Sequence, residues 1–324
     1  MNFSLENTLR IKTTQKCNRA CTFCHKEGGM EGLDDILYSD ELGHIINDIC
    51  TKLNIFSIAF TGGEPLMHDG LFDFTLSIAT NTAIQKFSLT TNGTIQKTYE
   101  FWRNFYDLGL GKVNISIPDI LQSATGNITD NETASMLSRQ INLIKILNCV
   151  GVNVDINVVI FNDYMHTEEV IKTLLKIKIE RELSFNINLL PNLLSDLEYK
   201  KSQMVIEKVK SDMLFSLKSK AARRGTSNHI ETYQANDGTI FYIKSTKPDN
   251  KFPYLLENGP CSKCELKRHC QEGFYGLRLE QIAGIFYIRL CIHKSTPDVL
   301  MPYQDFIHSN TYKILKSQWN EKSE

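Results

Sequence analysis

Two groups of cysteines stand out in a chain of 324 residues that contains nine of them. Cys17, Cys21 and Cys24 form a C-x3-C-x2-C triple near the N-terminus, and a second group lies in the last quarter of the chain. The members of the second group are Cys261, Cys264, Cys270 and Cys291. Thiols at short spacings in a reducing compartment are more often metal ligands than disulfides. The sequence therefore predicts two metal centres.

The first triple suits an iron–sulfur cube. A [4Fe–4S] cluster has four irons, and three thiolates from one short loop can hold three of them while the fourth stays open for an added ligand. Structural zinc sites usually take four ligands, as two pairs from separate turns. Zinc at the triple would need His25 as its fourth ligand. We therefore expect an iron–sulfur cluster with one open iron.

The overall composition is that of a globular protein with balanced charge. Lys and Arg number 36 against 37 Asp and Glu, the formal net charge is −1, and 42% of the residues are hydrophobic. A general nucleic-acid binder would show a basic excess, and a disordered chain would have fewer apolar residues. The N-terminus shows no signal-peptide pattern, and no apolar run is long enough to span a membrane. We expect a cytoplasmic protein that does not bind membranes.

Short β-rich runs alternate with helical stretches up to residue 194. Such β-then-α alternation predicts parallel strands joined by right-handed crossovers. Six units of this kind make an α/β fold, a partial (β/α)6 barrel, whose active site should lie at the C-terminal ends of its strands. The expected strands cover residues 8–13, 55–60, 86–89, 113–117, 153–160 and 184–190, and the expected helices cover 40–53, 70–80, 97–106, 134–147 and 166–178.

Glycines and polar residues follow several of these strands. Gly62, Gly63, Glu64 and Pro65 end the second expected strand. Thr91, Ser116 and Asn157 lie in or at the ends of the next three. Each of them alone has an ordinary explanation as a turn or packing residue. On the same rim as the cysteine loop, they together predict a site for one small polar ligand.

The cysteine triple followed by Gly62, Gly63, Glu64 and Pro65 resembles the radical S-adenosylmethionine (SAM) superfamily. The resemblance implies a [4Fe–4S] cluster whose open iron binds the amino and carboxylate groups of SAM. It further implies reductive cleavage of SAM to methionine and a 5′-deoxyadenosyl radical that abstracts hydrogen from the substrate. It places Phe23 near the adenine, Gly62, Gly63 and Glu64 at the methionyl ammonium, and Thr91, Ser116 and Asn157 at the ribose or carboxylate.

Within that superfamily the chain is similar to GTP 3′,8-cyclases and to enzymes with a twitch or SPASM extension. Two features depart from the cyclase pattern. The chain ends at Glu324 without a Gly-Gly tail, and its C-terminal cysteines do not follow C-x2-C-x13-C. We therefore expect a short peptide of the kind modified after ribosomal synthesis, or a small natural-product precursor, as the substrate. A GTP cyclase-like activity is the alternative.

The C-terminal third is expected to add a second centre to the barrel. Residues 195–222 are predicted to form one long charged helix, followed by a strand over 239–243 and a hairpin over 277–291. Cys261, Cys264, Cys270 and Cys291 suffice to ligate every iron of an auxiliary [4Fe–4S] cluster, and their spacing resembles twitch and SPASM domains. A four-cysteine zinc site is the alternative. The predicted parts are a barrel over 1–194, a helical bridge and strand over 195–250, and an auxiliary-cluster extension over 251–324.

The remaining candidates are weaker. Cys50 and Cys149 lie in helical stretches and are interpreted as packing residues, with a thiol hydrogen donor to a substrate radical as the functional alternative. A basic patch is expected at the end of the long helix. Its members are Lys218, Lys220, Arg223 and Arg224. The expected partner is a reductase or flavodoxin-type electron donor, and a non-catalytic iron–sulfur or zinc protein is the alternative of another class.

Overall fold

The computed structural model describes residues 2–5, 7–21, 24, 35–117, 130–223, 229–245, 259–265 and 276–320. The strands are β1 (Asn2–Leu5), β2 (Leu9–Thr14), β3 (Ser57–Gly62), β4 (Lys86–Thr91), β5 (Leu110–Ser116), β6 (Asn153–Ile160), β7 (Asn186–Pro191), β8 (Ser216–Arg223), β9 (His229–Gln234), β10 (Ile240–Ser245), β11 (Arg278–Ile282), β12 (Ile285–Arg289) and β13 (Leu300–Pro302). The helices are α1 (Asp40–Leu53), η1 (Pro65–Met67), α2 (Leu71–Asn81), α3 (Tyr99–Asp107), α4 (Asp130–Val150), α5 (Tyr164–Glu180), α6 (Asp196–Asp212), α8 (Tyr303–Phe306) and α9 (Asn310–Asn320).

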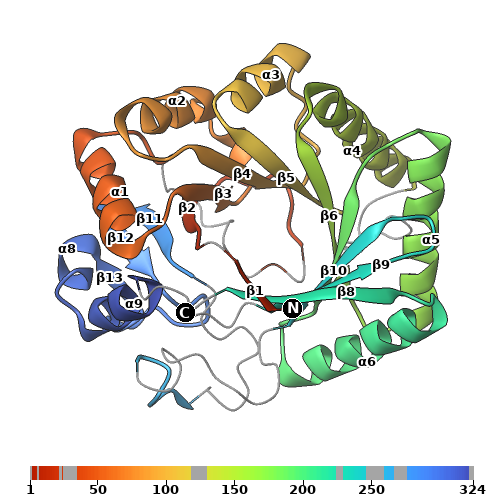
Figure 1. Cartoon of the computed structure of the whole chain (residues 1–324). Coiled ribbons are helices and arrows are strands. Elements are labelled where there is room, and N and C mark those ends of the chain that lie inside the picture. The colour runs from red at the N-terminus through yellow and green to blue at the C-terminus, as the bar shows by residue number, and fades with distance from the viewer. Residues whose placement is uncertain are drawn as a thin grey trace.

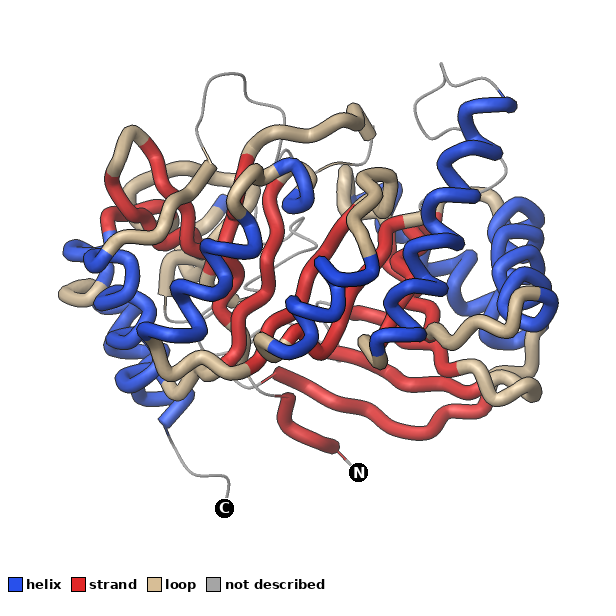
Figure 2. Tube along the Cα trace, turned by 90° about the horizontal axis from the view of Figure 1, so that it is seen from above, coloured by secondary structure: helices blue, strands red, loops and turns tan. Residues whose placement is uncertain are grey.

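One curved sheet contains all of these strands, in the order β1-β8-β9-β10-β7-β6-β5-β4-β3-β2-β11-β12-β13. Strands β2 to β7 are consecutive neighbours and run parallel. Helices α1 to α6 lie around the outside of the arc (Figure 1), and the edge strand β1 lies near the N-terminus (Figure 2). The predicted partial (β/α)6 barrel is confirmed.

Several helices begin at residues whose side chains cap their first turns. Ser39 accepts a hydrogen bond from the Leu42 N–H at 3.2 Å, and acidic residues occupy the first turn of α1. Asp163 and Ser195 accept in the same way from the third residue of α5 and α6. Such caps satisfy N–H groups that have no partner inside a helix. The start of α6 at Asp196 thus agrees with the sequence, which places the start of a helix at Ser195.

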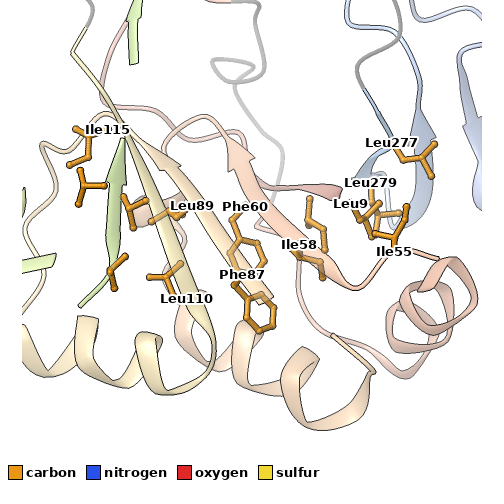
Figure 3. Packing of buried hydrophobic residues seen from close by; sticks show 14 of the residues in the cluster. Leu9, Ile55, Ile58, Phe60, Phe87, Leu89, Leu110, Ile115, Leu277 and Leu279 are labelled. Carbon is orange, nitrogen blue, oxygen red and sulfur yellow. The ribbon is translucent and has the colours of Figure 1, made fainter. Parts of the chain in front are cut away.

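The alternation of side chains along each strand separates an apolar core from a polar interior. On β5, Val113 and Ile115 are fully buried towards the helices, whereas Asn114 and Ser116 face the inside of the arc and line its cavity. Figure 3 shows part of this core, with Phe60 and Phe87 from neighbouring strands stacked at 5.6 Å between ring centroids. Because strand side chains alternate between faces, the inner face is left for polar groups that can meet a ligand.

The C-terminal third extends the sheet at both ends of the parallel run. Strand β10 pairs parallel with β7, and β11 pairs parallel with β2. The hairpin predicted around Gly284 is confirmed, because β11 and β12 pair antiparallel across a turn that contains Gly284. The three-part division of the chain stays a prediction, and strands from all three parts join one sheet.

The prediction of one long helix over 195–222 is wrong beyond Asp212. Helix α6 ends there, and Leu214 takes a left-handed conformation with φ of 51° that turns the chain into β8. Strand β8 pairs with β9 on one side and with β1 on the other. This pairing overrides the helix preference of its Lys and Ala residues, since tertiary context outweighs propensity.

The basic patch therefore lies on a strand and not at a helix end. Lys218, Lys220 and Arg223 belong to β8, whereas Arg224 lies outside the described residues. Lys220 forms an ion pair with Glu231 of β9 at 2.6 Å. Lys220 accordingly contributes to the pairing of β8 with β9.

The C-terminal helices pack against α1. Tyr303 donates a hydrogen bond to Asp48, and the Asn320 side-chain amide donates to the Lys52 carbonyl at 2.8 Å. Asp48 also pairs with Lys52 at 2.6 Å, so one turn of α1 holds both α8 and α9. None of the helices in the described part of the chain has the length and apolar character of a membrane span.

The packing of the core predicts that Phe→Ala substitutions at two nearby positions lower the free energy of unfolding by different amounts. Phe60 is fully buried, whereas the side chain of Phe56, just before β3, is 48% exposed. We expect Phe60→Ala to lower the free energy of unfolding by about 3–5 kcal/mol, because it removes apolar contacts and leaves a cavity. Phe56→Ala should lower it by less than about 1 kcal/mol. Urea unfolding of both variants measures the difference, and equal losses would contradict this account of the core.

Candidate functional site

A cavity of about 350 Å³ opens inside the arc of strands. Its wall is formed by the cysteine loop, by the ends of β3 to β7, and by residues of β2, β10 and β11. The structure brings together at this wall eight of the residues singled out from the sequence. They are Cys17, Cys21, Cys24, Gly62, Gly63, Thr91, Ser116 and Asn157.

The cysteine loop is fixed by a close approach between two backbone segments. The Gly63 N–H donates to the Thr14 carbonyl at 2.9 Å, and the Glu64 N–H donates to the Lys16 carbonyl at 2.7 Å. A Cβ atom at Gly62 would overlap the Thr14 carbonyl oxygen, and one at Gly63 would overlap that of Lys16. Only residues without side chains allow this contact. The glycine pair therefore holds the start of the loop that carries Cys17.

Glu64 is buried beneath the rim, and its carboxylate accepts three hydrogen bonds from the protein. Oε1 accepts from the Thr91 hydroxyl at 2.7 Å and from the Leu66 N–H at 3.1 Å, and Oε2 accepts from the Asn92 N–H at 2.6 Å. Burial raises the pKa of Glu64, and the three donors act against that rise. Glu64 thus links the ends of β3 and β4 in this structure, and its contact with a methionyl ammonium stays a prediction.

A hydrogen-bond network continues from Glu64 to the cysteine loop. Asn92 donates through Nδ2 to Asn18 Oδ1 at 2.8 Å, and Asn18 Nδ2 donates to the Thr94 hydroxyl at 2.9 Å. Gln140 of α4 donates to the carbonyl of Asn92 at 2.7 Å and to that of Ser116 at 3.3 Å. Sequence analysis missed Asn18 and Gln140. Asn18 lies in a loop and Gln140 lies in an ordinary helical stretch, so neither position predicts a place in this hydrogen-bond network.

Asn157 is oriented by a second asparagine on the inner face of the barrel. Asn188 of β7 donates through Nδ2 to Asn157 Oδ1 at 2.7 Å, and Asn188 is almost fully buried. The Asn157 amide nitrogen is therefore a donor on the cavity wall. Sequence analysis missed Asn188, although it falls within the sixth expected strand.

The three thiols of the loop differ in their surroundings. Burial raises the pKa of Cys17 and of Cys21, and the positive charge of Arg19 acts against the rise at Cys21. Cys24 is exposed, and its N–H donates to the Cys21 carbonyl at 3.1 Å in a tight turn. Metal binding replaces thiol protons, so partly buried thiols beside a guanidinium suit an anionic metal cluster. Phe23 lies outside the described residues.

The described part of the chain contains no site that is ready to hold a single metal ion. Among the residues that the structure places, no three His, Cys, Asp or Glu side chains converge closely enough to hold a single metal ion. A zinc ion needs four donors at about 2.0–2.3 Å from one centre. A cube spreads its ligands over separate irons.

Three of the C-terminal cysteines lie in described segments, and one of these segments reaches the cavity wall. Cys261, Cys264 and Cys291 are partly buried, and the Cys264 N–H donates to the Cys261 carbonyl at 3.2 Å. Lys294 hydrogen-bonds with the Cys264 side chain, which brings the two segments together and raises the pKa of Lys294. Ile292, next to Cys291, lines the cavity. Cys270 lies outside the described residues.

The two remaining cysteines lie away from the cavity. Cys50 is buried in α1, and burial raises its pKa to about 12. Cys149 is exposed on α4. Neither is among the described residues that line the cavity. A role as hydrogen donor would require contact with the substrate, so these positions support the packing interpretation for Cys50.

Comparison with known proteins gives a family and several relatives. The profile of the Radical SAM superfamily matches residues 11–175. A probable GTP 3′,8-cyclase of Methanococcus maripaludis is 36% identical over 110 residues, which cover 34% of this chain and 36% of that protein. A GTP 3′,8-cyclase of Clostridium perfringens is 31% identical over 166 residues, which cover 49% of this chain and 48% of that protein. The chain thus matches half or less of the length of these relatives.

Solved structures share the fold over nearly the whole chain. Streptococcus suis SuiB bound to S-adenosylmethionine superposes with a TM-score of 0.58 and 16% identity, covering 97% of this chain and 68% of that one. Native anSMEcpe with bound AdoMet and Cp18Cys peptide superposes with a TM-score of 0.57 and 17% identity, covering 99% and 85%. The superposition therefore includes the C-terminal extension of the barrel as well as its six units.

The backbone contact at Gly62 predicts that a Gly→Ala substitution destabilises the protein more at this position than elsewhere on the strands. Gly62→Ala should lower the free energy of unfolding by about 2 kcal/mol or more, because φ is 139° and the new Cβ meets the Thr14 backbone. Gly111→Ala on β5 is the matched control, since a Cβ there meets nothing within 4 Å. Urea unfolding compares them. A loss at Gly62 no larger than that at Gly111 would refute the close-approach interpretation.

Replacement of Glu64 tests the network beneath the rim. Glu64→Gln puts an NH₂ group where an oxygen now accepts from backbone or hydroxyl donors, so we expect a loss of about 2–3 kcal/mol in the free energy of unfolding. Glu169→Gln on the exposed face of α5 should change it by less than about 0.5 kcal/mol. Denaturant unfolding of the metal-free protein is the measurement. Equal stability of the two variants would show that the buried carboxylate is not needed.

Proposed function

The chain belongs to the radical SAM superfamily, and we propose that it is an enzyme that binds a [4Fe–4S] cluster through Cys17, Cys21 and Cys24 and uses SAM. The observation that carries this proposal is the cavity itself. Its wall combines the three thiols with glycine backbone and with polar side chains from successive strand ends. When bound, the cluster and SAM supply one-electron reductive cleavage of SAM and hydrogen abstraction from a substrate.

The residues of the wall would bind and orient the cofactor. Three thiolates leave one iron open, to which the amino and carboxylate groups of SAM would bind. Gly62 and Gly63 would present backbone groups of the cavity wall to the methionyl ammonium. Thr91, Ser116 and Asn157 would serve as hydrogen-bonding partners for the ribose or carboxylate. The apolar Val159, Leu190 and Ile292 on the same wall would help to exclude water.

An auxiliary [4Fe–4S] cluster is proposed at Cys261, Cys264, Cys270 and Cys291. The contact between Lys294 and Cys264 supports it, because that contact brings the Cys261–Cys264 turn to the segment that follows Cys291. Four thiolates would complete the coordination of all four irons, so that such a cluster would conduct electrons or stabilise the extension. A four-cysteine zinc site is the alternative.

For the substrate we propose a short peptide or a small natural-product precursor. The shared fold with SuiB and with anSMEcpe, the latter with a bound Cp18Cys peptide, is compatible with this choice. A GTP cyclase-like reaction is the second candidate, and it is favoured by the identity of 31–36% to GTP 3′,8-cyclases over 110 to 166 residues. A flavodoxin-type reductase is the proposed electron donor in either case.

Anaerobic reconstitution tests the number and kind of metal centres. We expect about eight irons per chain for two [4Fe–4S] clusters, and 5′-deoxyadenosine on addition of SAM and dithionite. Replacing Cys17, Cys21 and Cys24 together by Ala should leave about four irons and abolish SAM cleavage. Cys149→Ala, which changes an exposed thiol outside the cavity, should keep all of the iron.

Two results would contradict the proposal in different ways. About four irons with one zinc per chain would reject the auxiliary cluster and keep the first. An intact first cluster that does not cleave SAM would favour a non-catalytic iron–sulfur protein.

A further inference from the structure

The cysteine loop is held at both of its ends. It starts at the end of β2, where the Thr14 and Lys16 carbonyls accept hydrogen bonds from backbone N–H groups of the segment after β3. It finishes at residues 35–36, shortly before α1 begins. Residues 17–34 lie between these two points and include all three thiols of the triple. The groups that join the two ends therefore restrict the conformations that are open to the thiols.

Asp35 joins the two ends of the loop through its carboxylate. Oδ1 accepts from the Thr14 hydroxyl at 2.6 Å, and Oδ2 accepts from the Lys16 ammonium at 3.0 Å. The Thr14 hydroxyl in turn accepts from the Lys16 N–H at 3.1 Å. Hydrogen bonds to an ionised group are about twice as strong as neutral ones. One carboxylate thus attaches the far end of the loop to the residue directly before Cys17.

The same carboxylate also contacts the segment that follows β3. Oδ2 accepts from the Asp69 N–H at 3.3 Å, and Lys16 pairs with the Asp69 carboxylate at 3.7 Å. The Asp35 side chain is 11% exposed. Burial acts to raise the pKa of Asp35, but the hydrogen bonds from Thr14 and Lys16 outweigh it and hold this pKa below its ordinary value. Asp35 is therefore ionised at neutral pH, in the form that accepts all three hydrogen bonds.

A buried histidine fixes the residue that follows Asp35. His68 is 2% exposed, and its Nδ1 accepts from the Gly70 N–H at 3.1 Å. The other ring nitrogen, Nε2, therefore carries the proton and donates to the Ile36 carbonyl at 2.7 Å. The Ile36 N–H donates to the Thr13 carbonyl at 2.9 Å. The far end of the loop is thus attached both to β2 and to the segment after β3, as its start is.

The groups that join the two ends lie outside the cavity wall. Thr14, Lys16 and Asp35 are not among the described residues that line the cavity, whereas all three thiols of the triple are. Asp35 would therefore act on a bound cluster through the loop and not by contact with it. Fixing both ends of a loop removes conformations that the loop would otherwise lose when it binds a ligand. The thiols are in this way arranged before the cluster binds.

We propose that Asp35 is a positioning residue of the cysteine loop: by attaching the end of the loop to Thr14 and Lys16, it keeps the three thiols in the arrangement that receives the cluster. The inference rests on the proposed function in that it takes these thiols as cluster ligands. Asp35 lies outside the C-x3-C-x2-C motif, so the cysteine spacing does not indicate this role. Without its carboxylate, the loop would keep the backbone contacts at its start and lose the side-chain contacts at its end.

Thiol alkylation of the metal-free protein tests the loop in the absence of any cluster. Each cysteine is labelled with iodoacetamide at fixed pH, and the rates at individual residues are measured by mass spectrometry. We expect Asp35→Ala to raise the rates at Cys17 and Cys21, which are partly buried, by about tenfold or more. The exposed Cys149 should keep its rate, and the buried Cys50 should remain far slower than the loop thiols, which shows that the variant is folded.

Asp48→Ala is the matched control, because Asp48 likewise pairs with a lysine and accepts from a hydroxyl, but on α1. It should leave the rates at Cys17 and Cys21 within about twofold of those in the unaltered protein. Thr14→Val takes the place of Asp35→Ala if the latter fails to fold, since it removes one donor to Asp35 and keeps a similar shape. It should raise the same two rates by about threefold or more.

The reconstituted protein supplies a second readout. The fraction of the reduced-cluster EPR signal that changes on addition of SAM reports the first cluster alone. We expect this fraction to be largest in the unaltered protein, smaller in Asp35→Asn, which keeps one acceptor oxygen, and smallest in Asp35→Ala.

The inference is overturned if the rates at Cys17 and Cys21 do not rise in the folded test variant, or if Asp48→Ala raises them equally. It is also overturned if Asp35→Ala matches the unaltered protein in the SAM-dependent EPR fraction. A complete absence of SAM-dependent signal from the unaltered protein would instead reject the proposed function, and the alkylation rates of the metal-free protein would still decide the role of Asp35.

Discussion

The contact between the backbone of Thr14–Lys16 and that of Gly62–Glu64 is the constraint on which the site depends. Two strands that pair in register would normally diverge as one enters a loop, but here two hydrogen bonds keep them together past the end of β3. The absence of side chains at Gly62 and Gly63 makes this geometry accessible. The cysteine loop thus begins from a fixed position. Glu64 follows directly, and its buried carboxylate accepts hydrogen bonds from Thr91 and Asn92. The end of β4 is thereby held in a fixed position relative to the cysteine loop.

The two faces of the barrel strands have different roles, because one face is apolar and the other is polar. Stability comes from the side that faces the helices, where residues such as Phe60, Val113 and Ile115 are excluded from water. The inner side carries Asn, Thr, Arg and Lys residues that line the cavity, where polar groups can meet a ligand. A substitution of a polar side chain that lines the cavity should consequently affect ligand affinity, whereas a substitution on the outer face should affect folding.

The sequence predicted the parts of the molecule whose structure depends on local pattern. Strand and helix alternation gave the six barrel units, and Gly284 marked the hairpin of β11 and β12. The cysteine spacing and the glycine pair pointed to the cavity wall, because residues after parallel strands meet on one rim. Residues whose roles arise only from three-dimensional contact were missed. Asn188 orients Asn157, Gln140 joins two strand ends, and β8 is a strand because β1 and β9 pair with it.

The pairing of β11 with β2 joins segments from opposite ends of the chain, and β10 similarly returns to β7 after α6 and two further strands. Non-local pairings of this kind form slowly, because a long loop must close before they contribute any free energy. During synthesis, β2 and the cysteine loop leave the ribosome long before their neighbour β11 exists. The cavity wall is therefore completed only after β11 has been synthesised. This order of assembly would leave the first three thiols accessible to a metal donor throughout synthesis and would close the wall behind them afterwards.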